Sequence, residues 1–334
     1  MKPSHPIRVL AGDIGGTKTR LAIIEVEGTR LKTLRERTWR SREHASLRAI
    51  VQAFLEQVQI PVSAAAFGIA GPVRGRIADA TNLPWHIDAD ELEKRFAIGP
   101  VSLLNDLEAN AWGIQALSPD DLHELHPGAG AEAVGNAAII AAGTGLGEAG
   151  MYFDGQRHRP FASEGGHSDF SPCCELEIAL WRHLAERFGH VSWERVLAGP
   201  GLVNIHAFLR QHRHAETPAW LAEAMRQGDP AAAISRAAGE GRDPICEETL
   251  ELFTRLYGAE AGNLALKHMA RGGLYIGGGI APKILGWLKR ETFLQAFFAK
   301  GRMRPLLERI PVRVILNDRT ALYGPAVFAA LARQ

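Results

Sequence analysis

Residues 12–19 read Gly-Asp-Ile-Gly-Gly-Thr-Lys-Thr, a glycine-rich segment between two short apolar runs, Ile7–Ala11 and Leu21–Val26. The two runs predict strands, so the segment is expected to be a turn whose backbone N–H groups converge on an anion such as phosphate. It is neither a Walker A loop nor a GxGxxG motif that opens a helix. A hairpin turn that needs positive φ is the alternative, and this segment alone does not decide between the two. Asp13 favours phosphate bound with a divalent cation, because a bare carboxylate would repel phosphate.

Two further glycine clusters follow apolar strands. Gly143-Thr144-Gly145-Leu146-Gly147 lies between strands expected at 137–142 and 147–153, which gives a second candidate phosphate turn. Gly277-Gly278-Gly279-Ile280 lies between a strand at 274–276 and a helix whose start is marked by Pro282. Its small residues would let an adenine or a ribose lie against the backbone, and close helix–strand packing is the alternative.

Polar side chains stand at three other places. Asn105 and Asp106 follow a strand at 101–104 and open a helix, so one of them is expected to be the N-cap and the other to face a ligand. Residues 164–167, Glu-Gly-Gly-His, place a carboxylate and an imidazole around a flexible turn, with too few ligands for a metal site. Glu194, taken alone, would be an ordinary exposed helix residue.

The remaining pattern is that of an α/β protein. Residues 7–116 read as strands and helices in the order βββαβαβα, which predicts a mixed sheet with helices packed on it. Residues 118–135 form a candidate linker, and strands resume at 137. Helices are expected at 172–188, across 201–238 and at 244–270, and a closing helix at 321–332.

Composition excludes several classes of protein. The chain has 334 residues, of which 46% are hydrophobic and 22% charged, and this excludes a disordered or coiled-coil chain. A net charge of +1 gives no field for nucleic acid or an anionic membrane. Three cysteines cannot form a disulfide framework, and the longest apolar run is far shorter than the ~20 residues that span a bilayer. We therefore expect a cytoplasmic protein that binds neither nucleic acid nor membrane.

Together these segments resemble the bacterial glucokinases of the hexokinase/actin-like ATPase superfamily. Residues 12–17 look like the first phosphate motif of that family, and 142–147 like its second. Residues 104–106 look like its catalytic segment, 163–167 and 194–197 like its two sugar loops, and 277–280 like its adenosine motif. The order and spacing agree from residue 7 to 330. Six motifs in order are much more specific than any one of them.

The resemblance implies an actin-like ATPase (ribonuclease H-like) α/β fold of two lobes, with mixed sheets, helices and a cleft between the lobes. Residues 1–116 and 317–334 would form a small lobe. Residues 117–316 would form a large lobe that carries the sugar loops and a helical insert.

The resemblance also implies the roles of individual residues. Asp106 would be the catalytic general base, and Asp13 would hold Mg²⁺, through water. The sugar would be bound by Asn105, Asp106, Glu164, His167 and Glu194. ATP would be bound by Gly12, Asp13, Ile14, Gly15, Gly16, Thr17, Gly143, Thr144, Gly145, Gly278 and Gly279.

Two segments depart from the related patterns. Lys18 stands where the family leads us to expect asparagine, so the phosphate contact there is open. Residues 171–175, Ser-Pro-Cys-Cys-Glu, lack the spacing of the zinc loop of related ROK kinases, and we expect no structural zinc. Ser171 and Pro172 instead predict a helix cap and first turn.

The resulting hypothesis is a glucokinase of glycolysis that uses ATP and Mg²⁺ to phosphorylate D-glucose at its 6-hydroxyl, giving glucose 6-phosphate and ADP, and that forms a homodimer. A kinase for another hexose or an amino sugar is the alternative within the same class. A non-catalytic sugar-responsive regulator is the alternative from another class. It is disfavoured because the first strand begins at Ile7, which leaves no room for an N-terminal helix-turn-helix, and because the charge is balanced.

Overall fold

The computed structural model describes residues 6–28 and 30–333 and divides the chain into two units. Unit 1 comprises the described residues up to Asp121, Gln156–Ala162 and those from Asn317 onward, and unit 2 comprises Leu122–Gly155 and Ser163–Leu316. Each unit is built on its own sheet, with helices packed against it. The mixed α/β architecture predicted from the sequence is therefore confirmed.

Strands with uninterrupted apolar runs form the centre of the sheet in unit 1, whose order is β3-β2-β1-β4-β8. The strands are β1 (Ile7–Ile14), β2 (Lys18–Glu27), β3 (Arg30–Arg40), β4 (Ala64–Ile69) and β8 (Val101–Asn105). β1, β4 and β8 are parallel, and β2 and β3 continue the sheet antiparallel. All of β4 is buried, as expected for a strand covered by helices on both faces.

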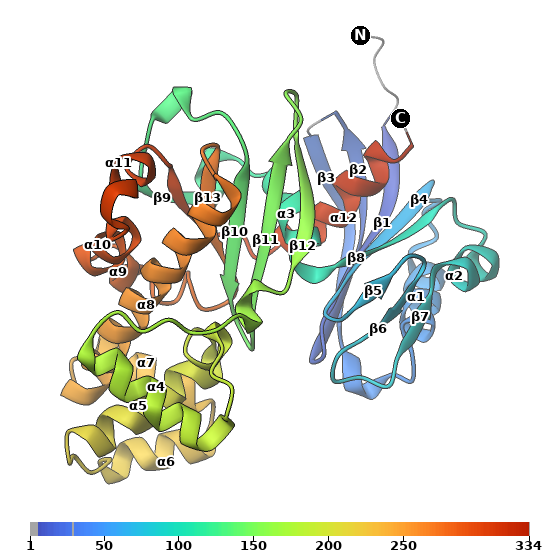
Figure 1. Ribbon diagram of the computed structural model, residues 1–334. Coiled ribbons are helices and arrows are strands. Elements are labelled where there is room, and N and C mark those ends of the chain that lie inside the picture. The colour runs from blue at the N-terminus through green and yellow to red at the C-terminus, as the bar shows by residue number, and fades with distance from the viewer. Residues whose placement is uncertain (1–5, 29, 334) are drawn as a thin grey trace. The chain divides into compact units, whose positions relative to one another are not determined.

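Helices cover both faces of this sheet (Figure 1). One face packs against α1 (Leu47–Val58) and α2 (Ala89–Phe96), with Phe54 of α1 and Phe67 of β4 in one core. The other face packs against α3 (Asp106–Ile114) and α12 (Thr320–Leu331). These two helices approach so closely that a Cβ on Gly324 would come 1.7 Å from the carbonyl oxygen of Ala109. Unit 1 thus needs the C-terminal helix to complete its core.

Unit 1 also contains a small sheet that the sequence pattern does not predict. It consists of β5 (Val73–Arg74), β6 (Ile77–Asp79) and β7 (His86–Asp88), and a short 3-10 helix η1 (Ser41–Glu43) follows β3. Asp88 ends β7 and begins α2, where its carboxylate accepts hydrogen bonds from the amides of Asp90 and Glu91. Asp88 is therefore the N-cap of α2, as an aspartate followed three residues later by Glu91 predicts.

The sheet of unit 2 is centred on the strand that precedes the second glycine cluster. Its strands, in the order β12-β11-β10-β13-β14-β9, are β12 (His158–Ser163), β11 (Leu146–Phe153), β10 (Ala137–Ala142), β13 (Gly273–Gly277), β14 (Val312–Ile315) and β9 (Leu122–His126). Of these, β12 belongs to unit 1 except for Ser163. β10 and β13 are parallel neighbours, so both glycine clusters that follow them lie at one edge of this sheet.

Helices make up most of unit 2 (Figure 1). They are α4 (Glu175–Phe188), α5 (Gly199–His212), α6 (Ala219–Gln227), α7 (Pro230–Gly239), α8 (Pro244–His268), α9 (Leu285–Leu288), α10 (Glu291–Phe298) and α11 (Arg304–Leu307). Its short 3-10 helices are η3 (Gly130–Glu132), η4 (Gly165–His167), η5 (Trp193–Arg195) and η6 (Gly301–Met303). The remaining 3-10 helix, η2 (Pro119–Asp121), belongs to unit 1. Tyr257 and Phe253 of α8 are fully buried in the core of unit 2.

Three local predictions were wrong. The candidate linker at 118–135 contributes β9, a strand that pairs with β14. The helix predicted from Pro172 with a cap at Ser171 begins at Glu175, and its N-cap is Cys174; the amide of Cys173, just before the cap, donates to the carboxylate of Glu177 at 2.5 Å. The helix marked by Pro282 is a series of turns, and α9 begins at Leu285.

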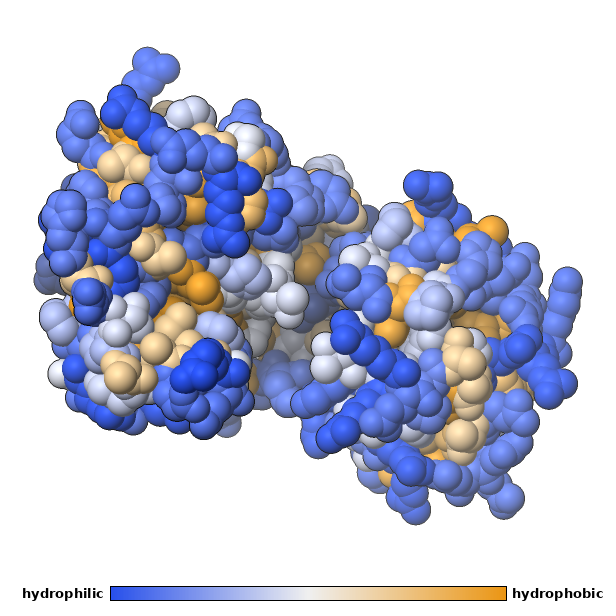
Figure 2. All heavy atoms as spheres, turned by 90° about the horizontal axis from the view of Figure 1, so that it is seen from below, coloured by the Kyte–Doolittle hydropathy of each residue, from blue (hydrophilic) through white to orange (hydrophobic). Residues whose placement is uncertain are grey.

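The surface of the protein is mainly hydrophilic. On the face drawn in Figure 2, hydrophilic side chains cover most of each unit and hydrophobic ones show between them. Within the described residues, no helix is both long and apolar enough to cross a membrane.

Candidate functional site

The first glycine cluster forms the tight connection between β1 and β2. The amide of Gly15 donates to the carbonyl of Lys18 at 2.9 Å, and Ser41 fastens the turn from outside by donating its hydroxyl to the carbonyl of Gly15 at 2.7 Å. Neither Gly15 nor Gly16 has φ in the left-handed range. A requirement for positive φ therefore does not explain these glycines. Thr17 and Lys18 are exposed at the tip.

Two of the predicted ATP-binding residues are packed into unit 1. Gly12 lies inside β1, where a Cβ would come 2.4 Å from Cδ1 of Phe67. The side chain of Ile14 is 1% exposed and belongs to the same core. Only the backbone of these two residues is available to a ligand.

Asp13 is the ionisable group at this end of β1. It is paired with Arg20 across the β1–β2 ladder, and Arg20 in turn binds Asp318 with 3.2 Å between Nη2 and Oδ2. Burial raises the pKa of Asp13, which Arg20 opposes and Asp318 reinforces. A carboxylate whose charge is costly in this way is stabilised by a cation brought next to it. Asp13 therefore fits the role of a Mg²⁺ holder.

Asn105 and Asp106 lie at the carboxyl end of β8. Asn105 is the N-cap of α3, where its Oδ1 accepts from the amide of Leu107 at 3.0 Å. Asp106 is the first helical residue, and its Oδ1 accepts from the same amide at 2.9 Å. Both side chains are partly exposed. The sequence pattern predicts one cap and one polar side chain that faces a ligand. Asn105 is the cap, but Asp106 accepts from the same amide, so the two side chains do not divide these roles as predicted.

The register of unit 1 brings Asp106 to the same sheet edge as the first glycine turn. Ile14 pairs with Ile69, and Ile69 pairs with Asn105, all in parallel ladders. Since neighbouring strands are about 4.8 Å apart, the ends of β1 and β8 are roughly 10 Å apart, with β4 between them. Such a space suits a phosphate group with its counterion between the turn and the carboxylate.

The second glycine cluster connects β10 and β11 in unit 2. The amide of Gly143 donates to the carbonyl of Gly145, and the amide of Gly199 donates to the carbonyl of Gly143, both at 2.8 Å. Glu194 lies against this turn, because its Oε2 accepts from the amide of Leu146 at 3.0 Å. Glu194 is thus a partly buried residue of η5 that holds the turn, rather than an ordinary exposed helix residue.

The turn that carries Glu164 and His167 is packed on the same place. A Cβ on Gly166 would come 2.1 Å from the carbonyl oxygen of Leu146, so only glycine fits there. The side chains of Glu164 and His167 are 83% and 61% exposed, with 3.9 Å between Oε2 and Nε2. Within unit 2 the structure therefore brings together three segments from distant parts of the sequence.

The third glycine cluster joins them through the parallel pair β10 and β13. The amide of Ile280 donates to the carbonyl of Ala142 at 3.2 Å, and Gly278 has φ of +82°. A Cβ on Gly278 would come 2.3 Å from that carbonyl oxygen. Gly278 and Gly279 are exposed. The cluster therefore combines both predicted features: its backbone packs closely against β10, and part of that backbone is exposed to a ligand.

Sequence reasoning missed three residues that support these turns. Ser41 holds the first turn, as described above. Tyr257 accepts from the amide of Ala142 at 3.2 Å at the start of the second turn. Glu148, one residue after that turn, is 1% exposed. Of these three residues, only Glu148 is unusual in the sequence, because it is a carboxylate inside an otherwise apolar strand.

The cysteine segment is a contact between α4 and α8. Arg255 donates to Sγ of Cys174 at 3.2 Å and pairs with Glu177 at 3.0 Å. Cys173 is exposed. Across residues 6–28 and 30–333 no three His, Cys, Asp or Glu side chains are grouped so as to hold a metal ion.

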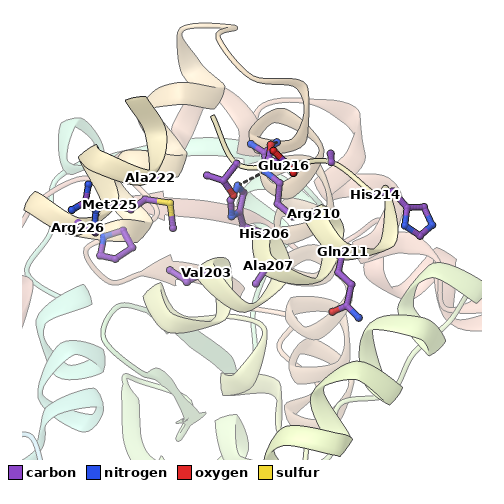
Figure 3. Close-up of a pocket in the computed structure, with 13 residues that line it drawn as sticks. Val203, His206, Ala207, Arg210, Gln211, His214, Glu216, Ala222, Met225 and Arg226 are labelled. Carbon is purple, nitrogen blue, oxygen red and sulfur yellow. Dashed lines mark hydrogen bonds between the residues drawn. The ribbon is translucent and has the colours of Figure 1, made fainter. Parts of the chain in front are cut away.

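A cavity of about 850 Å³ lies among α5, α6 and α7, away from these segments (Figure 3). Arg210 on its wall donates from Nε to Nε2 of His206 at 3.1 Å and pairs with Asp243 at 2.7 Å. Burial, together with the charge of Arg210, lowers the pKa of His206 to about 4, against which Asp243 acts. Since Asp243 neutralises the charge of Arg210, this side chain has a structural role. None of the predicted site residues lines this cavity.

Known proteins are similar to this chain over nearly its whole length. The family model described as Glucokinase matches residues 10–332. The glucokinase of Trichormus variabilis is 45% identical, over 96% of this chain and 98% of its own. The crystal structure of a glucokinase from an Antarctic psychrotroph has a TM-score of 0.86 at 30% identity, covering 97% of this chain and 99% of its own.

A more distant solved structure shares the fold alone. It is that of a ROK family glucokinase from Streptomyces griseus in complex with glucose and AMPPNP, with a TM-score of 0.66 at 24% identity, covering 97% of this chain and 99% of its own. Identity and coverage, rather than fold alone, are what assign a family, and here both are high for the Glucokinase model and the Trichormus variabilis protein. This chain belongs to the glucokinase family.

Proposed function

We propose that this protein transfers the γ-phosphoryl group of ATP to the 6-hydroxyl of D-glucose, giving glucose 6-phosphate and ADP. Membership of the glucokinase family supports the reaction. The observation that carries the chemistry is Asp106, a partly exposed carboxylate at the end of β8 and at the same sheet edge as the first glycine turn. Phosphoryl transfer needs positioning and charge neutralisation more than covalent help, and these residues supply both.

Asp106 acts as the general base in this proposal. The sugar 6-oxygen forms a bond to the γ-phosphorus, and the bond from that phosphorus to the bridging oxygen breaks with its electron pair left on ADP. The proton of the 6-hydroxyl passes to the carboxylate of Asp106. The hydrogen bond from Leu107 to Oδ1 fixes the orientation of the carboxylate. Proton transfer of this kind contributes roughly 10²–10⁴-fold to the rate.

In this proposal the sugar hydroxyls are bound by five polar side chains, those of Asn105, Asp106, Glu164, His167 and Glu194. Each sugar hydroxyl is both donor and acceptor, so carboxylates, an amide and an imidazole are suitable partners. Inverting one hydroxyl would leave a carboxylate unpaired, which is how such a site rejects epimers.

The glycine turns bind the nucleotide. Residues 12–17 and 143–145 contact the phosphates through backbone N–H groups, and Gly278 and Gly279 lie against the adenosine. Asp13 holds Mg²⁺ through water, since Mg²⁺ gives up its water reluctantly, and the bound ion would neutralise phosphate charge. The raised pKa of Asp13 supports this assignment, because burial makes its charge costly without a cation.

Three further properties belong to the same proposal. The residues 1–116 with 317–334, and 117–316, act as the small and the large lobe. The protein works in the cytoplasm, which its three unpaired cysteines support. It forms a homodimer, on the strength of the family resemblance.

The decisive variant is Asp106→Asn. Asparagine keeps an oxygen that accepts from Leu107 but cannot take a proton, so we expect kcat to fall ~10²–10⁴-fold while the melting temperature stays within a degree or two. Glu108→Gln is the control, because it removes a carboxylate from the same helical turn. It should change kcat by less than about threefold. A wild-type kcat for Asp106→Asn in a coupled glucose 6-phosphate assay would end the general-base assignment.

A further inference from the structure

Two buried carboxyl groups of unit 2 interact with each other, and one of them packs against the turn at 164–167. Glu148 of β11 is 1% exposed and Glu260 of α8 is 0% exposed. Neither carboxylate oxygen of Glu148 has a hydrogen-bond donor among the described residues. An ionised carboxylate without partners in such a place is costly, and a second one beside it is costlier still.

The hydrogen-bond partners of Glu148 and Glu260 determine which of the two carboxyl groups carries a proton. Glu260 accepts from Nδ2 of Asn263 at 2.7 Å and pairs with Lys267 at 3.4 Å. Burial raises the pKa of Glu260, and Asn263, Lys267 and Lys300 act against this rise. Glu148 has no such donor. The arrangement therefore stabilises the anion on Glu260 and the proton on Glu148, whose hydroxyl can then donate to Glu260.

Glu148 also lies directly beneath the turn that carries Glu164 and His167. A Cβ on Gly165 would come 2.0 Å from Oε2 of Glu148, so the glycine backbone rests on the carboxyl group. Gly165 has its own bonds, since its amide donates to Oγ of Ser163 at 3.0 Å and its carbonyl accepts from Oγ of Ser168 at 2.6 Å. Its contact with Glu148 is therefore one of packing, which a charge on Glu148 would disturb.

We propose that Glu148 is a positioning residue, and that its neutral form, hydrogen-bonded to Glu260, holds the 164–167 turn in the conformation that binds the sugar. This inference rests on the proposed function of that turn. Loss of the proton would place two negative charges together and draw water toward them, which displaces the turn. Sugar affinity should therefore fall when Glu148 ionises, whereas the chemical step on bound sugar should change less.

The pH at which this happens is set by the surroundings of Glu148. Burial, followed by the charge of Glu260, raises the pKa of Glu148 to about 8, against which Lys267 acts. Tyr257, on the same helix, keeps its proton because burial raises its pKa. Burial lowers the pKa of Lys300, so Lys300 is the other group whose charge can change on the alkaline side. Glu164 and His167 extend from the turn into solvent.

The test compares wild type with Glu148→Gln over pH 6 to 9.5. If only the protonated form binds sugar well, the glucose KM of wild type should rise ~10-fold between pH 7 and pH 9, because the competent fraction falls by that factor. Glutamine imitates the neutral carboxyl and can donate to Glu260. The variant should therefore keep the low KM at pH 7 and show no rise at pH 9. A rise that persists in Glu148→Gln would assign the effect to another group and overturn the proposal.

Glu177→Gln is the matched control, because Glu177 is a buried glutamate of unit 2 that is 3% exposed. It should keep the wild-type rise of glucose KM. Infrared spectroscopy provides a readout independent of catalysis: the carbonyl band of a protonated carboxyl should be present at pH 7, titrate near pH 8 and be absent in Glu148→Gln. Absence of that band in wild type overturns the proposal. If the band titrates but the protein does not phosphorylate glucose, it is the proposed function that has failed.

Discussion

Replacing Glu194 by alanine should weaken nucleotide binding as well as sugar binding. Oε2 of Glu194 accepts from the amide of Leu146 at 3.0 Å, and Leu146 is 5% exposed. The same oxygen lies 2.5 Å from where a Cβ on Gly145 would be, so the carboxylate is pressed against the second glycine turn. Truncation removes the acceptor of a buried amide. We expect the free energy of unfolding to fall by about 1–3 kcal/mol, the cost of leaving such a group unpaired.

The same loss sets the size of the kinetic effect. If the full 1–3 kcal/mol is felt by the turn, the ATP KM of Glu194→Ala should rise between about 5- and 150-fold. Glu194→Gln separates the two roles of this side chain. Its amide oxygen can still accept from Leu146, with roughly half the strength of a charged acceptor. We therefore expect a nearly normal ATP KM and a raised glucose KM in Glu194→Gln, but a rise in both in Glu194→Ala.

The assay is steady-state kinetics with each substrate varied in turn, together with urea unfolding of both variants. Arg195→Ala is the control for local disturbance of η5, because the Arg195 side chain lies over the ring of Phe188 rather than on the turn. If Glu194→Ala raises the glucose KM alone and leaves ATP KM and stability unchanged, the bond to Leu146 does not anchor the turn.

Two other variants test the packing that supports the site. Gly166→Ala would place a Cβ 2.1 Å from the carbonyl oxygen of Leu146, so the backbone must shift; we expect the glucose KM to rise at least ~10-fold, and a wild-type KM would contradict this. Asp243→Asn keeps an N-cap acceptor but leaves Arg210 buried without its partner, which should cost roughly 3–5 kcal/mol in urea unfolding at pH 7. Burial acts to raise the pKa of Asp243, yet the hydrogen bonds from Arg210 and from the amide of Cys246 outweigh it and hold the pKa below 3.8. This contribution is therefore present above pH 3.8 and is lost as the pH falls through the folded value, so acid should destabilise wild type more than the variant.

Much of the fold follows from local signals in the sequence. The apolar runs of β1, β4, β8 and β10 predict strands, and the periodicity of α1 and the cap at Asp88 predict helices, because buried faces and caps leave local patterns. The missed strands are short or at a sheet edge. β12 contains Pro160. A proline is tolerated in an edge strand, but in a sequence it argues against predicting a strand. β9, with two histidines and a glutamate among its five residues, has no apolar alternation.

The sequence predicts the individual motifs of the candidate site but not the contacts between distant segments that hold these motifs in place. The glycine turns and the strand-end pair Asn105 and Asp106 are recognisable because their residue types are unusual where they stand. The bond from Glu194 to the Leu146 amide could not be predicted, since it joins segments far apart in sequence and depends on how η5 packs. For the same reason nothing in the sequence pairs Glu148 with Glu260.

Helix α8 is the common support that connects these features of unit 2. The hydroxyl of Tyr257 accepts from the amide of Ala142 at 3.2 Å and lies 3.4 Å from the carbonyl oxygen of Gly277, to which it can donate. These two residues are the last of β10 and β13, each directly before a glycine turn. One turn further along α8, Glu260 interacts with Glu148, which packs against Gly165 of the turn at 164–167. Helix α8, in which Tyr257 and Glu260 are both 0% exposed, therefore supports the second and third glycine turns and the turn at 164–167. Rigid support of this kind is what a reaction that depends on positioning requires.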